Sequence, residues 1–252
     1  MFDVAAEAYD AFMGRYSTPL APRFCDFAGI GSERRVLDVG CGPGALITEL
    51  VGRLGSAGVS AVDPSHSFVQ AVRERHPDVD VRQASAEQLP FHEDEFDASL
   101  AQLVVHFMDD PFAGLQEMTR VTRSGGVVAA CVWDHAGGQG PLSPFWDAAR
   151  ELDPEGVRDE SELAGARKGH LSELLEKVGL EGVEETLVSV SVEHASFEEW
   201  WQPFTFGVGP AGAYLAALDG DQQLRLRELC RERSPSEGVT VTAGAWAARG
   251  VA

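Results

Sequence analysis

The sequence predicts an α/β fold, in which helices cover both faces of a largely parallel β-sheet. The main observation is that short apolar segments, typical of buried strands, alternate with helical segments over the first 135 residues or so. Such strands and helices form right-handed βαβ units, and the parallel sheet binds ligands beyond the carboxyl ends of its strands. A chain of 252 residues is long enough for one such domain with insertions.

The first half of the chain divides into five predicted strands with helices around them. The expected strands are Val36–Val39, Val59–Val62, Val79–Gln83, Phe96–Leu100 and Val127–Trp133, with a turn at Ser124-Gly125-Gly126 before the last. The expected helices are residues 1–30, Ala45–Leu54, a segment from the N-cap Ser65 to Arg75, and Phe112–Val121. The first of these helices has an apolar face formed by Phe2, Ala5, Ala6, Tyr9, Phe12, Met13 and Tyr16.

The second half is less regular. A glycine-rich loop at Asp134–Gly140 precedes an irregular helical segment over residues 141–168 and an amphipathic helix at His170–Val178. The alternation of Leu187–Glu193 predicts a strand, Phe197–Arg233 is expected to be helical, and Gly238–Val251 is expected to be the last strand.

Composition limits the classes of partner. The net charge of −20 disfavours nucleic acid and anionic membrane surfaces, and no apolar segment predicts a signal peptide or a membrane span. The cysteines, Cys25, Cys41, Cys131 and Cys230, form no CxxC pair, and no cluster of residues has metal-ligand spacing. We therefore expect a cytoplasmic protein with a small-molecule partner and no metal. The sequence does not indicate an oligomeric state.

The glycine turn after the first strand predicts a ligand site. Gly40, Gly42 and Gly44 alternate with Cys41 and Pro43 and open a helix, so the backbone can approach a ligand closely. A dinucleotide site has the spacing G-x-G-x-x-G and uses backbone N–H groups to bind pyrophosphate. The spacing here is G-x-G-x-G, and Pro43 lacks an N–H group. A ligand without phosphate fits this turn better.

Two acidic residues restrict the chemical class of the ligand further. Asp63 ends the second strand, about 20 residues beyond the turn, where an acid meets a ribose hydroxyl pair. Asp38 lies inside a strand, where a carboxylate requires a cation or several hydrogen-bond donors. A turn-forming role for Asp63 and a loop-capping role for Asp38 are the structural alternatives. Together the features indicate a ligand with a ribose, a positive charge and no phosphate, and S-adenosylmethionine has all three properties.

These segments resemble the class I S-adenosylmethionine-dependent methyltransferases, within the small-molecule group called type 11. VLDVGCGPG (36–44) resembles the first motif of the family, AVDPS (61–65) its ribose-binding segment and ASAEQLPF (84–91) its adenine-binding turn. FDASLAQLVVHFMDDP (96–111) and VTRSGGVVAACVWD (121–134) resemble the fourth and fifth strand regions, and GHLSELLEKVGL the helix before the sixth strand. The resemblance implies a Rossmann-like sheet of seven strands, mostly parallel, whose antiparallel last strand (239–248) lies beside the fifth.

The resemblance also implies which residues bind S-adenosyl-L-methionine. The glycine turn would hold the methionine part, Asp38 its amino group and Asp63 the ribose hydroxyls. Ser85 stands where the family often has Asp to accept the adenine amino group; serine accepts without a charge. Tyr16, together with Arg15, would close over the cofactor. The full cofactor set is Tyr16, Asp38, Gly40, Cys41, Gly42, Gly44, Asp63, Pro64, Ser65, Phe68, Ser85, Ala86, Glu87, Ala101, Gln102 and Leu103.

The acceptor site is expected to lie under helical insertions. The whole of 1–252 would form one methyltransferase domain, with residues 1–30 as an N-terminal cap and 141–168 and 197–233 as lid segments around the substrate pocket. His106 and His135 follow the fourth and fifth strands and are the candidate catalytic bases. The aromatic residues Trp133, Phe145, Trp146, Trp200, Trp201, Phe204 and Phe206 are candidate walls for an apolar or aromatic acceptor, or else the core of the lid.

Three other functions stay open at this level. A nicotinamide-dependent oxidoreductase would use a similar sheet, but the spacing of the glycine turn, Pro43 and the absence of a Tyr-x-x-x-Lys pair disfavour it. A non-catalytic module could keep the cofactor site alone, because fold does not ensure function. The same cofactor could also serve an elimination or a cyclisation.

Overall fold

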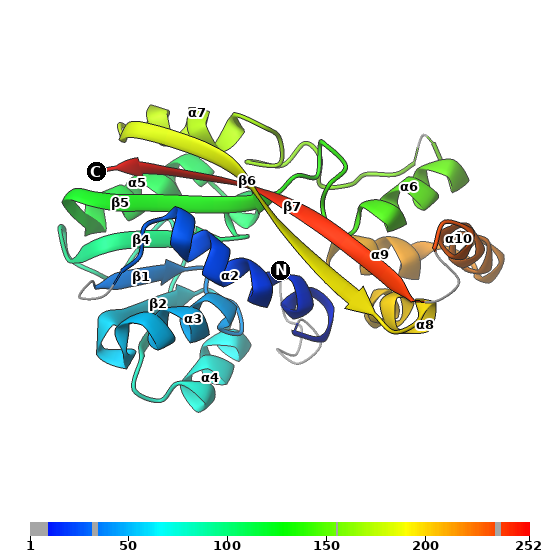
Figure 1. Cartoon of the computed structure of the whole chain (residues 1–252), viewed down its shortest axis with the longest axis horizontal. Coiled ribbons are helices and arrows are strands. Elements are labelled where there is room, and N and C mark those ends of the chain that lie inside the picture. Colours follow the sequence, from blue (N-terminus) through cyan, green and yellow to red (C-terminus); the bar gives the residue numbers. More distant parts are fainter. Residues whose placement is uncertain (1–9, 32–34, 155, 235–237) are drawn as a thin grey trace.

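A seven-stranded mixed sheet forms the centre of the computed structural model, which describes residues 10–31, 35–154, 156–234 and 238–252 (Figure 1). The strand order is β3-β2-β1-β4-β5-β7-β6, and β7 runs antiparallel to both of its neighbours while the strands from β3 to β5 are parallel. The strands are β1 Val36–Val39, β2 Val59–Asp63, β3 Asp80–Gln83, β4 Phe96–Gln102, β5 Thr122–Trp133, β6 Glu181–His194 and β7 Val239–Val251. This arrangement confirms the predicted fold class.

Helices cover the two faces of this sheet. The main helices are α2 Arg15–Phe27, α3 Ala45–Leu54, α4 His66–Arg75, α5 Pro111–Val121, α6 Ser143–Leu152, α7 His170–Lys177, α8 Phe197–Trp201, α9 Gly209–Ala217 and α10 Gly220–Glu232. Shorter turns are η1 Asp10–Gly14, η2 Ser56–Gly58, η3 Val105–Phe107 and η4 Gln202–Phe206. Buried residues of α2, α3 and α4 pack on one face of the sheet, and those of α5 and α7 pack on the other. As predicted, Ser65 caps α4 by accepting a hydrogen bond from the Phe68 amide.

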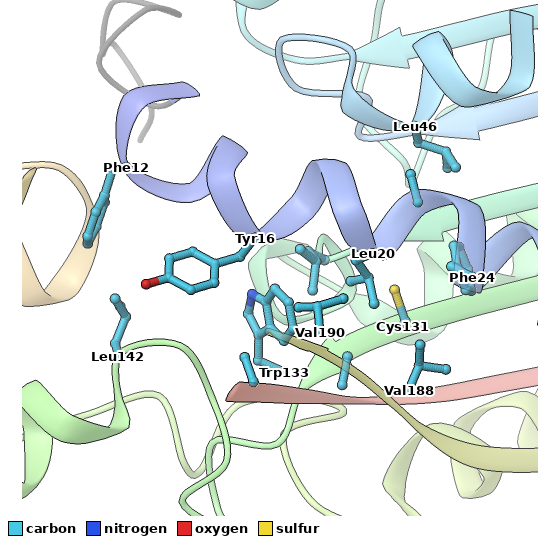
Figure 2. Packing of buried hydrophobic residues seen from close by; sticks show 14 of the residues in the cluster. Phe12, Tyr16, Leu20, Phe24, Leu46, Cys131, Trp133, Leu142, Val188 and Val190 are labelled. Carbon is cyan, nitrogen blue, oxygen red and sulfur yellow. The ribbon is translucent and has the colours of Figure 1, made fainter. Parts of the chain in front are cut away.

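The core beside α2 joins the N-terminal helix to the sheet. Tyr16, Leu20 and Phe24 recur at intervals of four residues, so they lie on one face of α2. Figure 2 shows these side chains beside Cys131 of β5 and Val190 of β6, and all of them are buried. Because α2 contacts strands from distant parts of the chain, its position depends on the whole sheet.

The segments that were expected to form a lid contain an aromatic cluster, which Phe12 joins from the N-terminal segment. The rings of Phe145 and Phe204 are stacked, with centroids 4.6 Å apart, and Phe204 also meets Phe12 edge-on at 5.2 Å. Trp146, Trp200 and Trp201 are likewise buried, whereas Phe206 is 47% exposed. Most of the aromatic residues expected as substrate walls therefore pack on one another, whereas Trp133 lines a pocket.

Several expected boundaries are wrong. Ser124-Gly125-Gly126 is not a separate turn, because β5 begins at Thr122 and accommodates these residues as a bulge between the pairs Phe96↔Thr122 and Ala98↔Val127. The strand expected at Leu187–Glu193 extends back to Glu181, because β7 supplies hydrogen-bond partners along that whole length. The described part of residues 141–168 is helical only at Ser143–Leu152. Residues 197–233 are helical as expected, divided among α8, η4, α9 and α10.

At the N-terminus, α2 ends at Phe27 instead of near residue 30. The expected apolar residues Phe2, Ala5, Ala6 and Tyr9 lie outside the described residues. Within the ranges that are described, no helix is both long and apolar enough to cross a membrane.

We expect Asp219→Ala to lower the free energy of unfolding by about 1 kcal/mol, because this side chain caps α10. Its carboxylate accepts from the Gln222 amide at 2.8 Å, and the Gln222 side chain accepts from the Asp219 amide at 3.1 Å. Chemical denaturation measures the change. Asp221→Ala removes an acid from the same first turn without breaking the cap, so an equal loss in both variants would assign the effect to the helix dipole instead.

Candidate functional site

A cleft of about 570 Å³ lies at the carboxyl ends of the four parallel strands β3, β2, β1 and β4. Each of these strands contributes the segment that follows it, as the parallel topology predicts. The lining residues are Ser17, Gly40, Cys41, Gly42, Pro43, Ala45, Leu46, Asp63, Pro64, Ser65, His66, Ser67, Phe68, Ser85, Ala86, Glu87, Gln102, Leu103, Val104, Phe107, Met108 and Asp109.

The turn after β1 is held against β2. The amides of Gly40 and Cys41 both donate to the carbonyl oxygen of Val62, at 2.9 and 3.0 Å. Gly40 has a φ of +71°, and a Cβ there would overlap the Val104 side chain and come within 2.8 Å of Val104 Cβ. Only glycine therefore fits between this turn and the segment after β4, and the close packing brings the backbone to the floor of the cleft.

Asp63 links this turn to the start of α4. Its Oδ2 accepts from the Gly42 amide at 2.9 Å, and its Oδ1 accepts from the Ser65 amide at 2.8 Å. Burial raises the pKa of the Asp63 carboxyl, although the two amide bonds lower it. The carboxylate has further lone pairs on the wall of the cleft, so it can accept hydroxyl hydrogens from a ligand.

Asp38 is the buried acid of this site. Its side chain is 1% exposed in the middle of β1, and Oδ2 has no hydrogen-bond partner among the described residues. Burial and then the charge of Asp63 raise the pKa of the Asp38 carboxyl well above its usual range. A buried acid without a cation is unfavourable, so the local chemistry favours a positively charged group beside it.

The opposite wall joins the segments after β3 and β4. Glu87 Oε1 accepts from the amides of Asp109 and Asp110, at 3.0 and 3.3 Å. Gln102 Nε2 donates to the carbonyl oxygen of Ser17 at 3.1 Å, which fixes α2 at the edge of the cleft. Gln102 Oε1 is buried and has no partner within the described ranges.

A second, smaller pocket of about 40 Å³ adjoins the cleft, since Leu103 and Phe107 line both. Its other walls are Phe12, Met13, His106, Trp133, His135, Leu142, Glu160, Val208, Gly209 and Pro210, and we call it the histidine pocket. Figure 2 shows three of these walls, Phe12, Trp133 and Leu142, at the end of the core beside Tyr16. The pocket thus lies between the N-terminal segment, the segments that follow β4 and β5, and residues from 142 to 210.

Burial dominates the chemistry of the histidine pocket. The rings of His106 and His135 lie 5.9 Å apart, and burial lowers their pKa values to about 3 and about 4. Burial also raises the pKa of Glu160 to about 7, and Trp146 Nε1 donates to its Oε2 at 3.1 Å. Both imidazoles are therefore neutral near pH 7, and each can accept a hydrogen bond at one ring nitrogen. Holding a proton there requires a nearby negative charge to offset the burial.

The structure brings together most of the predicted cofactor residues, but not all of them. Gly40, Cys41, Gly42, Asp63, Pro64, Ser65, Phe68, Ser85, Ala86, Glu87, Gln102 and Leu103 line the cleft. Asp38, Gly44 and Ala101 are not on its wall; Asp38 and Ala101 are buried, and Gly44 precedes α3 with a φ of +101°. Tyr16 also lies off the wall, because its hydroxyl bonds His194 Nε2 at 3.0 Å, and Ser17 takes the place at the edge of the cleft.

Other residues of the two pockets were not predicted. Val104, Phe107, Met108 and Asp109 line the cleft because β4 ends at Gln102 and the chain turns back through η3. Their position directly after a predicted strand was a usable signal. Glu160 lies in an irregular stretch between α6 and α7, where no sequence pattern indicates its position.

Comparison with known proteins finds a family match in the first half of the chain. Residues 37–130 match the family described as a methyltransferase domain. A curated relative, the uncharacterized methyltransferase Rv3342 of Mycobacterium tuberculosis, is 35% identical over 133 residues, which are 53% of this chain and 51% of that protein. The matched region thus spans about half the length of this relative.

The fold continues beyond that region in solved structures. The YcgJ protein of Bacillus subtilis superposes with a TM-score of 0.58 at 18% identity, covering 94% of this chain and 97% of that one. The [4+2]-cyclase SpnF superposes with the same TM-score at 17% identity, covering 93% of this chain and 81% of that one. At these identities the likeness establishes the fold alone.

Proposed function

Because this chain carries a class I methyltransferase domain of the type 11 group, we propose that it transfers a methyl group from S-adenosylmethionine to a small apolar or aromatic acceptor. The observation that carries the proposal is Asp38, a buried acid whose Oδ2 has no partner in the described part of the chain. The methionine part of the cofactor has an ammonium group, which meets the need for a cation at this acid. Asp63 complements the ribose, and the turn containing Pro43 does not require a phosphate.

The residues of the cleft, together with Asp38 and Gly44 beside its glycine turn, would hold the cofactor in three parts. Asp38 and the turn from Gly40 to Gly44 would hold the methionine part, and Asp63 would accept from the ribose hydroxyls. Pro64, Ser65, Phe68 and the segment from Ser85 to Glu87 would hold the adenine, with Gln102 and Leu103 as the opposite wall. When bound, S-adenosylmethionine supplies an electrophilic methyl group whose leaving group is a neutral thioether. The chain then has to align the acceptor and exclude water, because the leaving group needs no protonation.

The acceptor would enter beside the cleft. The histidine pocket adjoins the cleft at Leu103 and Phe107, and its walls are mainly apolar. This environment supports an apolar or aromatic acceptor, and it includes His106 and His135, the two candidate bases. We propose residues 141–168 and 197–233 as the lid over this pocket, within a single domain over 1–252 capped by the N-terminal residues 1–30. Four free, buried cysteines fit a reducing compartment such as the cytoplasm.

A second candidate uses the same cofactor site for different chemistry. The likeness to the [4+2]-cyclase SpnF supports this alternative, because it associates the fold with a cyclisation in another protein. Formation of S-adenosylhomocysteine during turnover distinguishes the two functions, since methyl transfer produces it and a cyclisation does not. A non-catalytic module would bind S-adenosylmethionine without producing S-adenosylhomocysteine.

We expect Asp63→Ala to weaken binding of S-adenosylhomocysteine by about 10- to 100-fold, the contribution of hydrogen bonds to a charged group. Titration calorimetry with the natural ligand and its 2′-deoxy analogue tests the ribose contact. The analogue should bind the wild type more weakly than the natural ligand and bind the variant equally, because the variant has no carboxylate for the hydroxyl. Asp80→Ala, which removes an acid from β3 outside the cleft, is the matched control. Binding of neither ligand by the folded wild type would refute the proposed function.

A further inference from the structure

The histidine pocket contains three buried polar atoms that have no hydrogen-bond partner within the described ranges. These atoms are His106 Nδ1, His135 Nε2 and Trp133 Nε1. His106 is 8% exposed, the side chain of His135 is 6% exposed and Trp133 is 2% exposed. All three residues line the same cavity of about 40 Å³.

Such a concentration of unsatisfied groups calls for polar partners inside the cavity, which a ligand or ordered water can supply. Buried polar atoms in native proteins nearly always have partners, and each unpaired one is costly. A cavity of this size has room for one polar group and its immediate neighbours. The remainder of a larger molecule would extend past Leu103 and Phe107 toward the cleft, because those two side chains line both spaces.

The hydrogen-bonding capacity of the three atoms defines the chemical class of that group. The indole N–H of Trp133 can only donate, whereas a neutral imidazole accepts at one of its nitrogens. A hydroxyl group both donates and accepts, so it can satisfy the indole and an imidazole at once. An ether or a ketone oxygen can only accept. A carboxylate would be repelled, since Glu160 lines the pocket and no Lys or Arg does so among the described residues.

We propose that the histidine pocket binds the hydroxyl group of a neutral, phenol-like acceptor, and that His106 Nδ1 takes the hydroxyl proton during methyl transfer. This inference rests on the proposed function and specifies its acceptor. In the step, the acceptor oxygen forms a bond to the methyl carbon and the carbon–sulfur bond breaks with its electron pair going to sulfur. The products are a methyl ether, neutral S-adenosylhomocysteine and a protonated His106. We assign the proton transfer to His106, because its ring lies 3.9 Å from that of Phe107, which lines both the pocket and the cleft.

Two further residues would support this base. His135 lines the same cavity, and its Nε2 has no partner within the described ranges, so we assign it the positioning of the hydroxyl group. Glu160 Oε2 lies 3.9 Å from His135 Nδ1, so an ionised Glu160 would stabilise a positive charge on the pair of imidazoles. Glu160 is thus assigned an electrostatic role and no contact with the acceptor.

The test uses phenol as the probe and histidine NMR as the readout, so it does not depend on turnover. Wild-type protein with ¹³C-labelled histidine is saturated with S-adenosylhomocysteine and titrated with phenol, anisole and benzoate. We expect phenol to shift two histidine signals saturably, those of His106 and His135, and to leave the other histidines unchanged. Anisole, which has no hydroxyl hydrogen, and benzoate, which is charged, are expected to bind at least tenfold more weakly.

Variants separate the pocket from general effects on the fold. Trp133→Phe keeps an aromatic ring at this position and removes the N–H donor, so it should weaken phenol binding by at least fivefold. His106→Phe should abolish the phenol response of His135, whereas His92→Gln, at an exposed position, should change neither signal. Affinity for S-adenosylhomocysteine should stay within twofold in all three variants, which also shows that they are folded.

Three results would overturn the inference. The first is that phenol shifts neither imidazole while S-adenosylhomocysteine binds normally, and this leaves the proposed function intact. The second is that anisole or benzoate binds as tightly as phenol, because the pocket would then not recognise the hydroxyl group of the acceptor. The third is that S-adenosylhomocysteine itself does not bind, which refutes the proposed function and the inference together.

Discussion

Replacing Asp38 with asparagine is expected to weaken binding of S-adenosylmethionine by about a hundredfold or more while stabilising the ligand-free protein. The loss in affinity follows because removal of one partner from a buried ion pair costs about 3–5 kcal/mol. The gain in stability follows because Asp38 is 1% exposed and its Oδ2 has no partner in the described part of the chain. Asparagine has a similar shape and carries no charge that burial would penalise.

The stability difference between Asp38→Asn and the wild type should depend on pH, and its direction follows from the pKa of Asp38. The pKa of Asp38 in the folded protein is raised well above its usual range, first by burial and then by the charge of Asp63. The folded protein therefore holds a proton that the unfolded chain releases, and the wild type loses stability as pH rises from the ordinary aspartate pKa through the raised value. Asp38→Asn has no such loss, so its advantage in unfolding midpoint should grow with pH. Thermal unfolding between pH 4 and pH 8 measures it.

The affinity for the cofactor should change with pH in the opposite direction. An ammonium group prefers the ionised carboxylate, so wild-type affinity should rise as pH passes through the raised pKa of Asp38, and the variant should show no such rise.

Asp134→Asn is the matched control for Asp38→Asn, because Asp134 is also buried but both of its oxygens have partners, Gly137 N and Gln139 Nε2. That variant should lose stability and keep its affinity for the cofactor. Unchanged cofactor binding in Asp38→Asn would contradict the assigned role.

The parallel strands and their ligand segments were predictable because their local sequence matches their environment. Residues 36–39 are buried throughout, so β1 reads as a continuous apolar strand interrupted by one acid, and the glycines mark its end. The outer part of β6 was not predictable in the same way. Its residues 181–186 are mostly polar and exposed or half-buried at the edge of the sheet, and they form a strand because β7 lies beside them.

Contacts between distant segments account for the residues that the sequence could not place. Tyr16 is directed away from the cleft by its bond to His194, which is 178 positions further along the chain. Glu160 reaches the histidine pocket through its bond to Trp146 and belongs to no regular element. In both cases a tertiary hydrogen bond fixes the side chain, and local propensity contains no information about it.

Replacing Gly40 with alanine is expected to lower the free energy of unfolding by about 2–5 kcal/mol and to abolish cofactor binding. Two costs combine, about 1–2 kcal/mol for a left-handed residue with a Cβ and about 1–3 kcal/mol for overpacking. Gly40 has a φ of +71°, and its added Cβ would overlap the Val104 side chain. Chemical denaturation gives the stability, and calorimetry with S-adenosylhomocysteine gives the affinity.

Gly42 and Val104 provide the controls that separate these two costs. Gly42 also has a positive φ, +53°, but nothing lies within 4 Å of a Cβ built there, so Gly42→Ala should show the backbone cost alone. Val104 supplies all three atoms that lie nearest the Cβ of Gly40→Ala, so the double variant Gly40→Ala/Val104→Ala should recover about 1–3 kcal/mol relative to the sum of the single variants. If Gly40→Ala is no less stable than Gly42→Ala, the turn can shift away from Val104, and close packing does not fix the floor of the cleft.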